Sequence, residues 1–229
     1  MFPKYFLFYV FFLLLLVSGC RRLTTTPETI DSYYLQYEIK YLEEMAGDIP
    51  TKLLPRKMDA YYSKHYVYTR IDGFFNQFTL VQIADLKRNR ISTLLDFFGT
   101  HVSYTGSKGE LPAAVMELEG LEIRFTKDTA TLGGFLSERI EVKTTDNQYD
   151  IYYTPDIKVR HPNISTPYTM VKYPLTSFRI QLSHLKMDLT CNKSEYKSVD
   201  YEMFSIPEEY KQVNRAAMEE IINNLFTKD

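Results

Sequence analysis

The stretch Ser32-Tyr33-Tyr34-Leu35-Gln36-Tyr37-Glu38-Ile39-Lys40-Tyr41-Leu42 decides the fold class of this chain. From its first tyrosine onward, every second side chain is apolar or aromatic, whereas Gln36, Glu38 and Lys40 lie between them. A period of two over this length is typical of a strand that buries one face and exposes the other. The stretch therefore predicts a half-buried β-strand.

The same pattern continues through most of the chain, with turn residues about every 8 to 12 positions. We expect a hairpin turn at Asp72-Gly73 and a long loop or lid over residues 155–176, which contain four prolines. Further strands are predicted near residues 91–97, 101–105, 113–118, 121–126, 129–132, 137–144, 148–154, 177–182, 185–191 and 195–202. A single sheet of this size has to curl or close. The predicted fold is mainly β, with one large, strongly curved antiparallel sheet that forms a half-barrel and carries a C-terminal helix.

The C-terminal residues change from a period of two to a helical period. Tyr210, Val213, Ala217, Ile221 and Leu225 recur every three or four positions. This spacing predicts an amphipathic helix over residues 207–226, whose apolar stripe packs on the sheet.

The N-terminus carries the most specific signal in the sequence. Lys4 precedes an uncharged apolar run over residues 5–17, which is shorter than the roughly 20 residues that a spanning helix needs. The run predicts a secretory signal peptide over residues 1–19. Val17-Ser18-Gly19-Cys20 resembles the lipobox of bacterial lipoproteins, which implies that Cys20 is acylated after cleavage. Two or three acyl chains anchor a soluble domain stably. The alternative is an uncleaved anchor helix in which Cys20 is incidental.

Arg21 and Arg22 follow the cysteine, where inner-membrane lipoproteins carry Asp. By resemblance to lipoprotein sorting rules, the lack of Asp and of an acidic cluster there implies the periplasmic side of the outer membrane. The alternative is that the two arginines only lie near anionic headgroups. Residues 20–31 contain three consecutive threonines and a proline, and predict an extended lipidated tether. We expect residues 32–229 to form a single β-rich domain.

Composition and motifs narrow the possible functions. The chain has 27 Lys+Arg against 29 Asp+Glu, a net charge of −2, which argues against nucleic acid as a partner. Its four histidines stand far apart, and no spacing predicts a metal site, a cofactor or catalytic residues. Cys191 lies in an alternating stretch and is expected to be a buried strand residue. We therefore expect a protein that is not an enzyme.

The chain also has a surplus of aromatic residues, with 19 tyrosines and 15 phenylalanines. On a curved sheet such side chains either line a concave binding face or fill the core under the C-terminal helix. If they bind a ligand, the candidate residues are Tyr33, Tyr37, Tyr41 and Phe78.

Several segments together resemble a known group of proteins. They are the tyrosine-rich first strand, Gly133-Gly134-Phe135, the stretch from Tyr149 to Ile157 and the stretch from Phe204 to Val213. This order resembles bacterial domain-of-unknown-function lipoproteins of the GLPGLI and DUF4412 groups, distant relatives of the LolA and LolB lipoprotein carriers. The resemblance implies an unclosed barrel with a helix against its concave face and a cavity that shelters acyl chains.

Three functional hypotheses follow from these observations. The leading one is a non-enzymatic lipoprotein that is anchored to the outer membrane through Cys20, faces the periplasm and binds an apolar or lipid-like ligand on the concave face. The alternative is an accessory subunit of a cell-envelope complex, with a filled core and a protein partner. The third is an envelope hydrolase.

Overall fold

The structure is a computed structural model that describes residues 28–73 and 78–225. The described chain is mainly β, with a large sheet and one C-terminal α-helix, which confirms the predicted fold class. The predicted signal peptide and Cys20 lie outside the described residues. The division into a tether and a single domain stays a prediction, although residues 29–31 of the predicted tether belong to the first strand. Within the described ranges, no helix is long and apolar enough to cross a membrane.

The large sheet of the described chain has twelve strands. Their bounds are β1 (Thr29–Tyr41), β4 (Lys57–Ser63), β5 (Tyr66–Gly73), β6 (Phe78–Asp85), β7 (Arg90–Phe97), β8 (Thr100–Thr105), β9 (Glu122–Leu132), β10 (Phe135–Lys143), β11 (Gln148–Tyr153), β12 (Leu175–Leu182), β13 (Leu185–Asp200) and β14 (Lys211–Gln212). The remaining elements are a small hairpin of β2 (Met45–Ala46) and β3 (Ile49–Pro50), the 3-10 turns η1 (Thr51–Leu53) and η2 (Tyr201–Phe204), and helix α2 (Arg215–Asn224).

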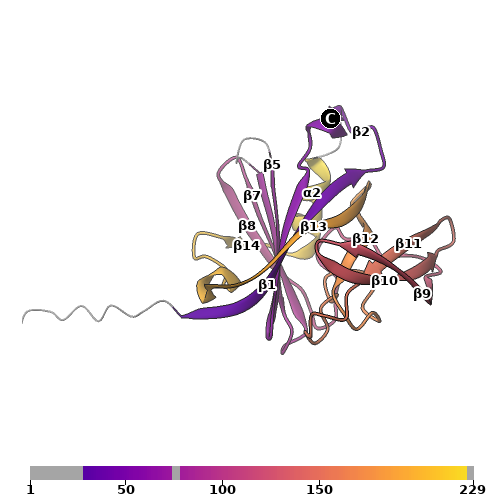
Figure 1. Cartoon of the computed structure of the whole chain (residues 1–229). Helices are drawn as coiled ribbons and strands as arrows, with labels where there is room; N and C mark the ends of the chain where they lie inside the picture. The colour runs from indigo at the N-terminus through magenta and orange to yellow at the C-terminus, as the bar shows by residue number, and fades with distance from the viewer. Residues whose placement is uncertain (1–27, 74–77, 226–229) are drawn as a thin grey trace, which may run out of the picture.

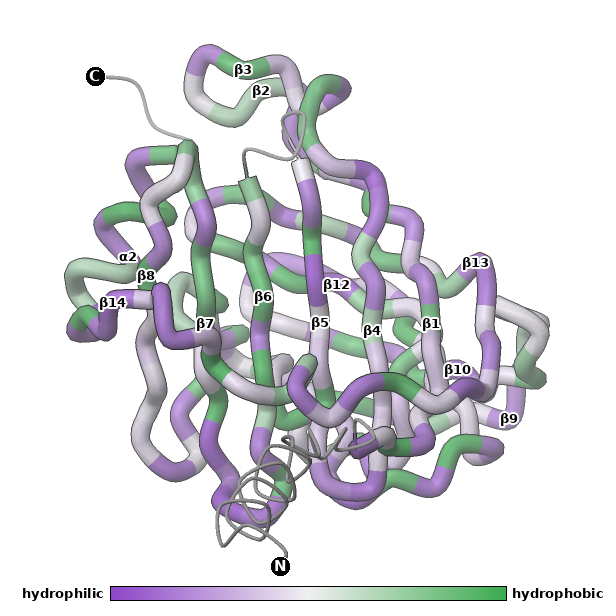
Figure 2. Tube along the Cα trace, turned by 90° about the vertical axis from the view of Figure 1, so that its left-hand side faces the viewer, coloured by the Kyte–Doolittle hydropathy of each residue, from purple (hydrophilic) through white to green (hydrophobic). Residues whose placement is uncertain are grey.

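The strand order is β14-β8-β7-β6-β5-β4-β1-β13-β12-β11-β10-β9, and only the β14–β8 pair is parallel. The long strands β1 and β13 pair with each other in the middle of the sheet. Figures 1 and 2 show the two halves folded toward one another there, with β12 behind β5 in Figure 2. The sheet is open and is not strongly curled into the predicted half-barrel. Twisted sheets of more than about ten strands commonly split into packed halves instead of curling.

The main hydrophobic core fills the space between these halves. Met58, Ile71 and Leu80 come from one half, and they share a small void with Leu182 and Met187 of the other half. All five side chains are buried. Burial of apolar surface between the halves therefore holds the bent sheet together.

A second, smaller apolar cluster covers the opposite face of β5, β6 and β7. Phe204 of η2 packs there with Tyr68, Val81, Ile83 and Leu94, and all five are buried. These three strands are therefore covered on both faces. This double burial explains why their sequences mix alternation with apolar runs.

Helix α2 begins eight residues later than the sequence predicted. Residues 211–212 pair with β8 as β14, and the Asn214 side chain then caps the helix by accepting from the Ala217 N–H at 2.9 Å. The predicted helical start at residue 207 was wrong because this pairing holds the chain extended. The side chains of this helix that are buried in the main core are Met218 and Ile222, which flank the predicted stripe, whereas Val213, Ile221 and Leu225 of the stripe are only partly buried against it.

An ion pair fixes the start of this helix against the loop that follows β8. Arg215 donates to the Glu110 carboxylate and, at 3.1 Å, to the Leu111 carbonyl. Hydrogen bonds from Tyr104 and Arg215 lower the pKa of Glu110 to about 2. The helix is therefore tied to the sheet by charge as well as by apolar packing.

Several local predictions differ from the structure. The strands predicted at 121–126 and 129–132 form one continuous strand, β9, and those predicted at 185–191 and 195–202 form one continuous strand, β13. Residues 113–118 form no strand, because Ala114 takes a left-handed φ of 63° and the segment makes only an isolated bridge, from Val115 to Leu182, within the described chain. Asp72 and Gly73 are not a turn but the end of β5, where Gly73 pairs with Phe78. The connection between these strands lies outside the described residues.

Candidate functional site

The four side chains predicted to bind a ligand do not line an open face. Tyr37 and Phe78 are 0% and 4% exposed, and Tyr33 and Tyr41 are half-buried against the main core. Tyr41 and Phe78 line one common void, whereas the Tyr33 ring lies 4.8 Å from the ring of Tyr196. Their role in ligand binding stays a prediction.

Tyr37 makes its hydrogen bonds inside the core. Its hydroxyl donates to the Leu175 carbonyl at 2.7 Å, so its oxygen is left to accept from the Tyr62 hydroxyl at 3.2 Å. Its ring meets Phe178 edge to face at 5.5 Å. Burial raises the pKa of Tyr37 well above its usual range. The hydroxyl therefore joins β1 to β12 across the core and does not point to an opening.

Two voids between the halves are small. They lie beside Tyr41 and beside Met58 and have volumes of about 20 Å³ each. A void of this size holds about one water molecule. Ligand pockets typically measure about 300 Å³ or more.

The segment between β11 and β12, residues 154–174, fills much of this interior. Ile157 and Tyr168 are 0% exposed and Val171 is 1% exposed. The amide of the buried Asn163 holds the segment in shape by donating to the Val171 carbonyl at 2.8 Å. The predicted long loop is present, but its side chains pack into the core and do not form a cover over it.

This segment also separates two strands of the sheet. β11 and β12 pair only near Tyr153 and Leu175 within the described chain, and they diverge beyond that point. Tyr168 enters the resulting fork and donates to the Arg179 carbonyl at 2.7 Å. The Tyr149 hydroxyl, 2.9 Å away, is left to donate to Tyr168. A side chain thus replaces the missing backbone pairing.

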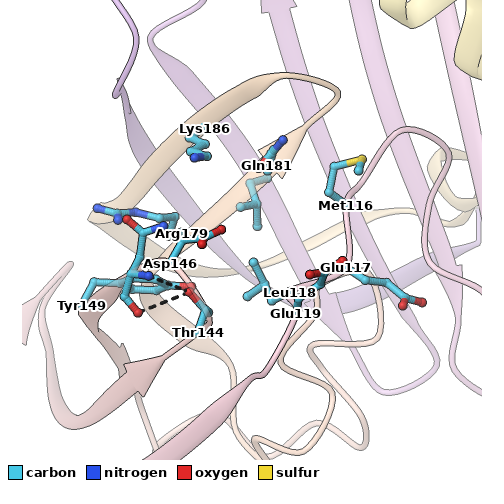
Figure 3. Close-up of a pocket in the computed structure, with 12 residues that line it drawn as sticks. Met116, Glu117, Leu118, Glu119, Thr144, Asp146, Tyr149, Arg179, Gln181 and Lys186 are labelled. Carbon is cyan, nitrogen blue, oxygen red and sulfur yellow. Dashed lines mark hydrogen bonds between the residues drawn. The ribbon is translucent and has the colours of Figure 1, made fainter.

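The fork contains a pocket of about 190 Å³, which is a candidate site (Figure 3). It lies between the turn after β10, strand β12 and the segment that precedes β9. Figure 3 shows Tyr149 and Arg179 on one side, Met116 and Glu117 on the other, and Leu118 and Gln181 between them. The complete lining is Met116, Glu117, Leu118, Glu119, Thr144, Asp146, Asn147, Tyr149, Arg179, Ile180, Gln181 and Lys186.

One wall of this fork pocket is rigid. The Arg179 guanidinium lies 4.4 Å from the centre of the Tyr149 ring, and it forms a two-point ion pair with Asp188 at 2.7 and 3.0 Å. The hydrogen bond to Asp188 raises the pKa of Arg179, and burial raises the pKa values of Tyr149 and Tyr168. The wall therefore presents a fixed cation on a flat aromatic support.

The remaining lining offers groups for hydrogen bonding. Glu117, Glu119 and Asp146 provide exposed carboxylates, and Gln181 and Lys186 provide donors. No group of three or more His, Cys, Asp or Glu side chains that could hold a metal ion occurs in the described ranges. The pocket can thus hold a small polar group, such as one side chain of a partner.

The sequence did not predict the fork pocket. The alternation of Ser177, Arg179 and Gln181 along β12 does indicate an outward polar face. No pattern, however, indicates that Tyr168 lies beside Tyr149, because the two belong to separate segments that meet only in the fold.

Cys191 lies where the sequence placed it, in β13 and 2% exposed. Its sulfur donates to the Lys193 carbonyl at 3.4 Å, and burial raises its pKa to about 11. Gly133 approaches it so closely that a Cβ there would lie 2.2 Å from its Sγ. Cys191 is therefore a packing residue.

Comparisons with known proteins give a structural likeness but no family. No protein-family model matches the chain, and no curated protein matches it. A solved structure of PNGF-II, peptide N-glycosidase F II, superimposes with a TM-score of 0.50 and 13% sequence identity. The match covers 85% of this chain and 33% of that one, so this chain spans about a third of the length of the protein it matches. At this identity the likeness shows the fold alone, and the resemblance to the GLPGLI, DUF4412 and Lol proteins stays a prediction.

Proposed function

We propose that this chain is a non-enzymatic accessory protein of the bacterial cell envelope. Acylated Cys20 anchors it to the periplasmic side of the outer membrane, and it binds an envelope protein partner through its outer surface. The observation that carries this choice is the filled interior. The buried segment 154–174 occupies the space between the halves, and the voids left there measure about 20 Å³.

The fork pocket is the part of the surface that best suits such a partner. Its volume of about 190 Å³ is smaller than most small-molecule sites, and its charged lining suits a polar side chain of a protein surface. The fixed Arg179 guanidinium would receive a carboxylate, and the carboxylates of Glu117 and Glu119 would receive a cation. Partner side chains of both charges thus find a complement in one small hollow.

The competing proposal is an apolar or lipid-like ligand held at Tyr33, Tyr37, Tyr41 and Phe78. It requires the two halves to separate, because a chain of methylene groups does not fit the voids beside these residues. Separation would also break the hydrogen bond from Tyr37 to Leu175. The filled-core proposal needs no such rearrangement.

One purification tests both proposals. The mature protein is extracted from native membranes, and mass spectrometry is run on the intact chain, on solvent-released material and on co-purifying proteins. The accessory proposal expects acylated Cys20, no bound lipid at stoichiometric amounts and one stoichiometric envelope protein. That protein should be lost from Gln181→Arg, which places a charge in the fork pocket, and retained by Gln212→Arg on the exposed strand β14.

The opposite result has a clear form. A reproducible, stoichiometric apolar molecule in the solvent extract, absent from a variant with an altered Tyr37, would refute the filled core and support the ligand proposal. A chain that carries no acyl group on Cys20 would refute the anchor.

A further inference from the structure

A second hollow, of about 720 Å³, lies at the end of the sheet that carries the β4–β5 and β6–β7 turns. These turns are at the lower end of the sheet in Figure 1. Its lining contains five lysine or arginine residues and two histidines, but no acidic residue. The lining residues are Lys64, His65, Leu86, Lys87, Asn89, Lys108, Lys158, Arg160 and His161. This group is called the basic hollow below.

The fold brings four separate segments together to form the basic hollow. The Leu86 N–H donates to the His65 carbonyl at 3.0 Å, which joins the two turns, and buried Leu86 is part of the lining. The Gly109 N–H donates to the Asn89 carbonyl at 2.9 Å, which adds the loop after β8. The fourth segment is residues 158–161, where His161 has a left-handed φ of 51°. Backbone hydrogen bonds thus hold three of the four cation-bearing segments in place.

Two acidic residues that lie close to the hollow in sequence, Asp85 and Glu110, are engaged elsewhere. Asp85 accepts from the backbone N–H groups of Lys87 and Arg88 and pairs with the Arg88 side chain. Glu110 is held by Arg215 and by the Ser107 N–H. Among the described residues, none of the five cations of the hollow forms an ion pair with a carboxylate.

Five like charges around one hollow repel each other, and an anion bound between them relieves that repulsion. Lysine ammonium groups are compact point charges that bind phosphate well, and Arg160 adds a planar donor. The volume exceeds what a single phosphate ion needs and leaves room for the groups to which the phosphate is attached. The chemistry of the basic hollow therefore fits a phosphorylated ligand.

The position of the hollow indicates the source of that phosphate. Ser32 pairs with Ser63 beside the β4–β5 turn, so β1 enters the sheet at the end where Lys64 lies. The stretch from Cys20 to Glu28 spans eight steps between Cα atoms and reaches at most about 28 Å when fully extended. An acylated Cys20 would therefore keep this end of the sheet near the membrane surface.

We propose that the basic hollow binds the phosphate groups of anionic lipid headgroups in the membrane that holds the anchor. This inference rests on the proposed function for the anchor at Cys20 and adds a second contact with the same membrane. The two contacts together orient the domain, with the β4–β5 and β6–β7 turns toward the membrane and the β2–β3 hairpin away from it (Figure 2). The orientation leaves the side of the sheet that carries the fork pocket accessible to a partner.

Lysine labelling tests the proposal. The mature acylated protein is reconstituted in vesicles of phosphatidylcholine alone or mixed with phosphatidylglycerol, and an amine-reactive reagent is followed by mass spectrometry. We expect phosphatidylglycerol to slow the labelling of Lys64, Lys87 and Lys108 by about tenfold. The exposed Lys52 and Lys127, which do not line the hollow, should label equally in both vesicles.

Substitutions give the matched control. Replacing Lys87 and Lys158 with glutamine should abolish most of the protection of Lys64 by phosphatidylglycerol, because each charge removed weakens binding by about fivefold. The same exchange at Lys52 and Lys127 removes equal charge and should leave that protection unchanged. If both double substitutions reduce the protection of Lys64 equally, the membrane attracts only the total charge of the protein, and the proposed site is overturned.

A third arm separates this proposal from the one on which it rests. Inorganic pyrophosphate is added to the protein in phosphatidylcholine vesicles. Protection by pyrophosphate but not by phosphatidylglycerol would overturn the headgroup assignment, and protection by neither would overturn the anion site. If the protein lacks the acyl mass and dissociates from both kinds of vesicle, the proposed anchor is refuted. The pyrophosphate experiment still tests the basic hollow in that case.

Discussion

Replacing Tyr37 with phenylalanine tests whether its hydroxyl serves the fold or a ligand. The hydroxyl is fully buried, donates to the Leu175 carbonyl at 2.7 Å and lies 3.2 Å from the Tyr62 hydroxyl. Its removal leaves a buried carbonyl without this donor, which should lower the free energy of unfolding by about 1–3 kcal/mol. Tyr41→Phe is the matched control. The Tyr41 hydroxyl donates to the Pro55 carbonyl at 2.9 Å but is only half-buried, so water can replace it, at a cost of less than about 1 kcal/mol.

Urea unfolding of the mature chain, followed by circular dichroism, measures this difference. With a slope of about 2 kcal/mol per molar urea, Tyr37→Phe should lower the midpoint by about 0.5–1.5 M without a change in slope. Tyr41→Phe should lower it by less than about 0.5 M. The reasoning is refuted if Tyr37→Phe unfolds at the wild-type midpoint, because the hydroxyl would then be free to serve a ligand.

Three other perturbations test the packing and the titrating groups. Gly133→Ala places a Cβ 2.2 Å from the Cys191 Sγ at a φ of 57°, and should lower the free energy of unfolding in urea by about 2–4 kcal/mol. Gly99→Ala is the control, because φ there is 78° but nothing lies within 4 Å, and it should lower the free energy of unfolding by about 1 kcal/mol. Burial raises the pKa of Tyr62 from 10 to about 12, so the stabilisation from its protonated form should be full below pH 10 and lost as the pH rises through 12. Urea midpoints measured against pH check this, and an equal loss in Tyr62→Phe would contradict it. The pKa of Glu110 is lowered from 4.5 to about 2, so the ionised carboxylate stabilises the fold fully above pH 4.5, and this stabilisation is lost as the pH falls toward 2. The urea midpoint of the wild type should therefore fall over this pH range, and the midpoint of Glu110→Gln should depend less on pH.

Local patterns in the sequence predicted the parts of the fold that depend on neighbouring residues. The period of two in residues 32–42 gave the strand that became β1, because alternate burial is set by the strand itself. The period also gave the apolar stripe of α2 but not its start, because Asn214 becomes the cap only once β14 has paired with β8. Pairing with a strand about 110 residues away leaves no local signal.

Both candidate sites depend on contacts of this long-range kind. The basic hollow takes Lys64, Lys87, Lys108 and Lys158 from four segments, each of which looks like an ordinary solvated turn. The net charge of −2 gives no sign that these lysines converge, because acidic residues such as Asp85 and Asp188 pair with arginines elsewhere on the surface. Total charge argues against a general attraction to polyanions, but it does not describe the charge of one hollow.

The tyrosine surplus has a structural explanation in the bent sheet. Two halves that face each other across a core are held by apolar packing, which does not fix their register. The Tyr37 hydroxyl adds a directional contact between the halves, because it donates from β1 to the Leu175 carbonyl at 2.7 Å. Within the second half, Tyr168 ties the 154–174 segment to β12 by donating to the Arg179 carbonyl at 2.7 Å. Phenylalanine would fill the same space without a donor. Tyr37 and Tyr168, two of the many tyrosines, therefore have roles in holding the fold together, and the charged hollows on the outer surface are the places where we propose recognition.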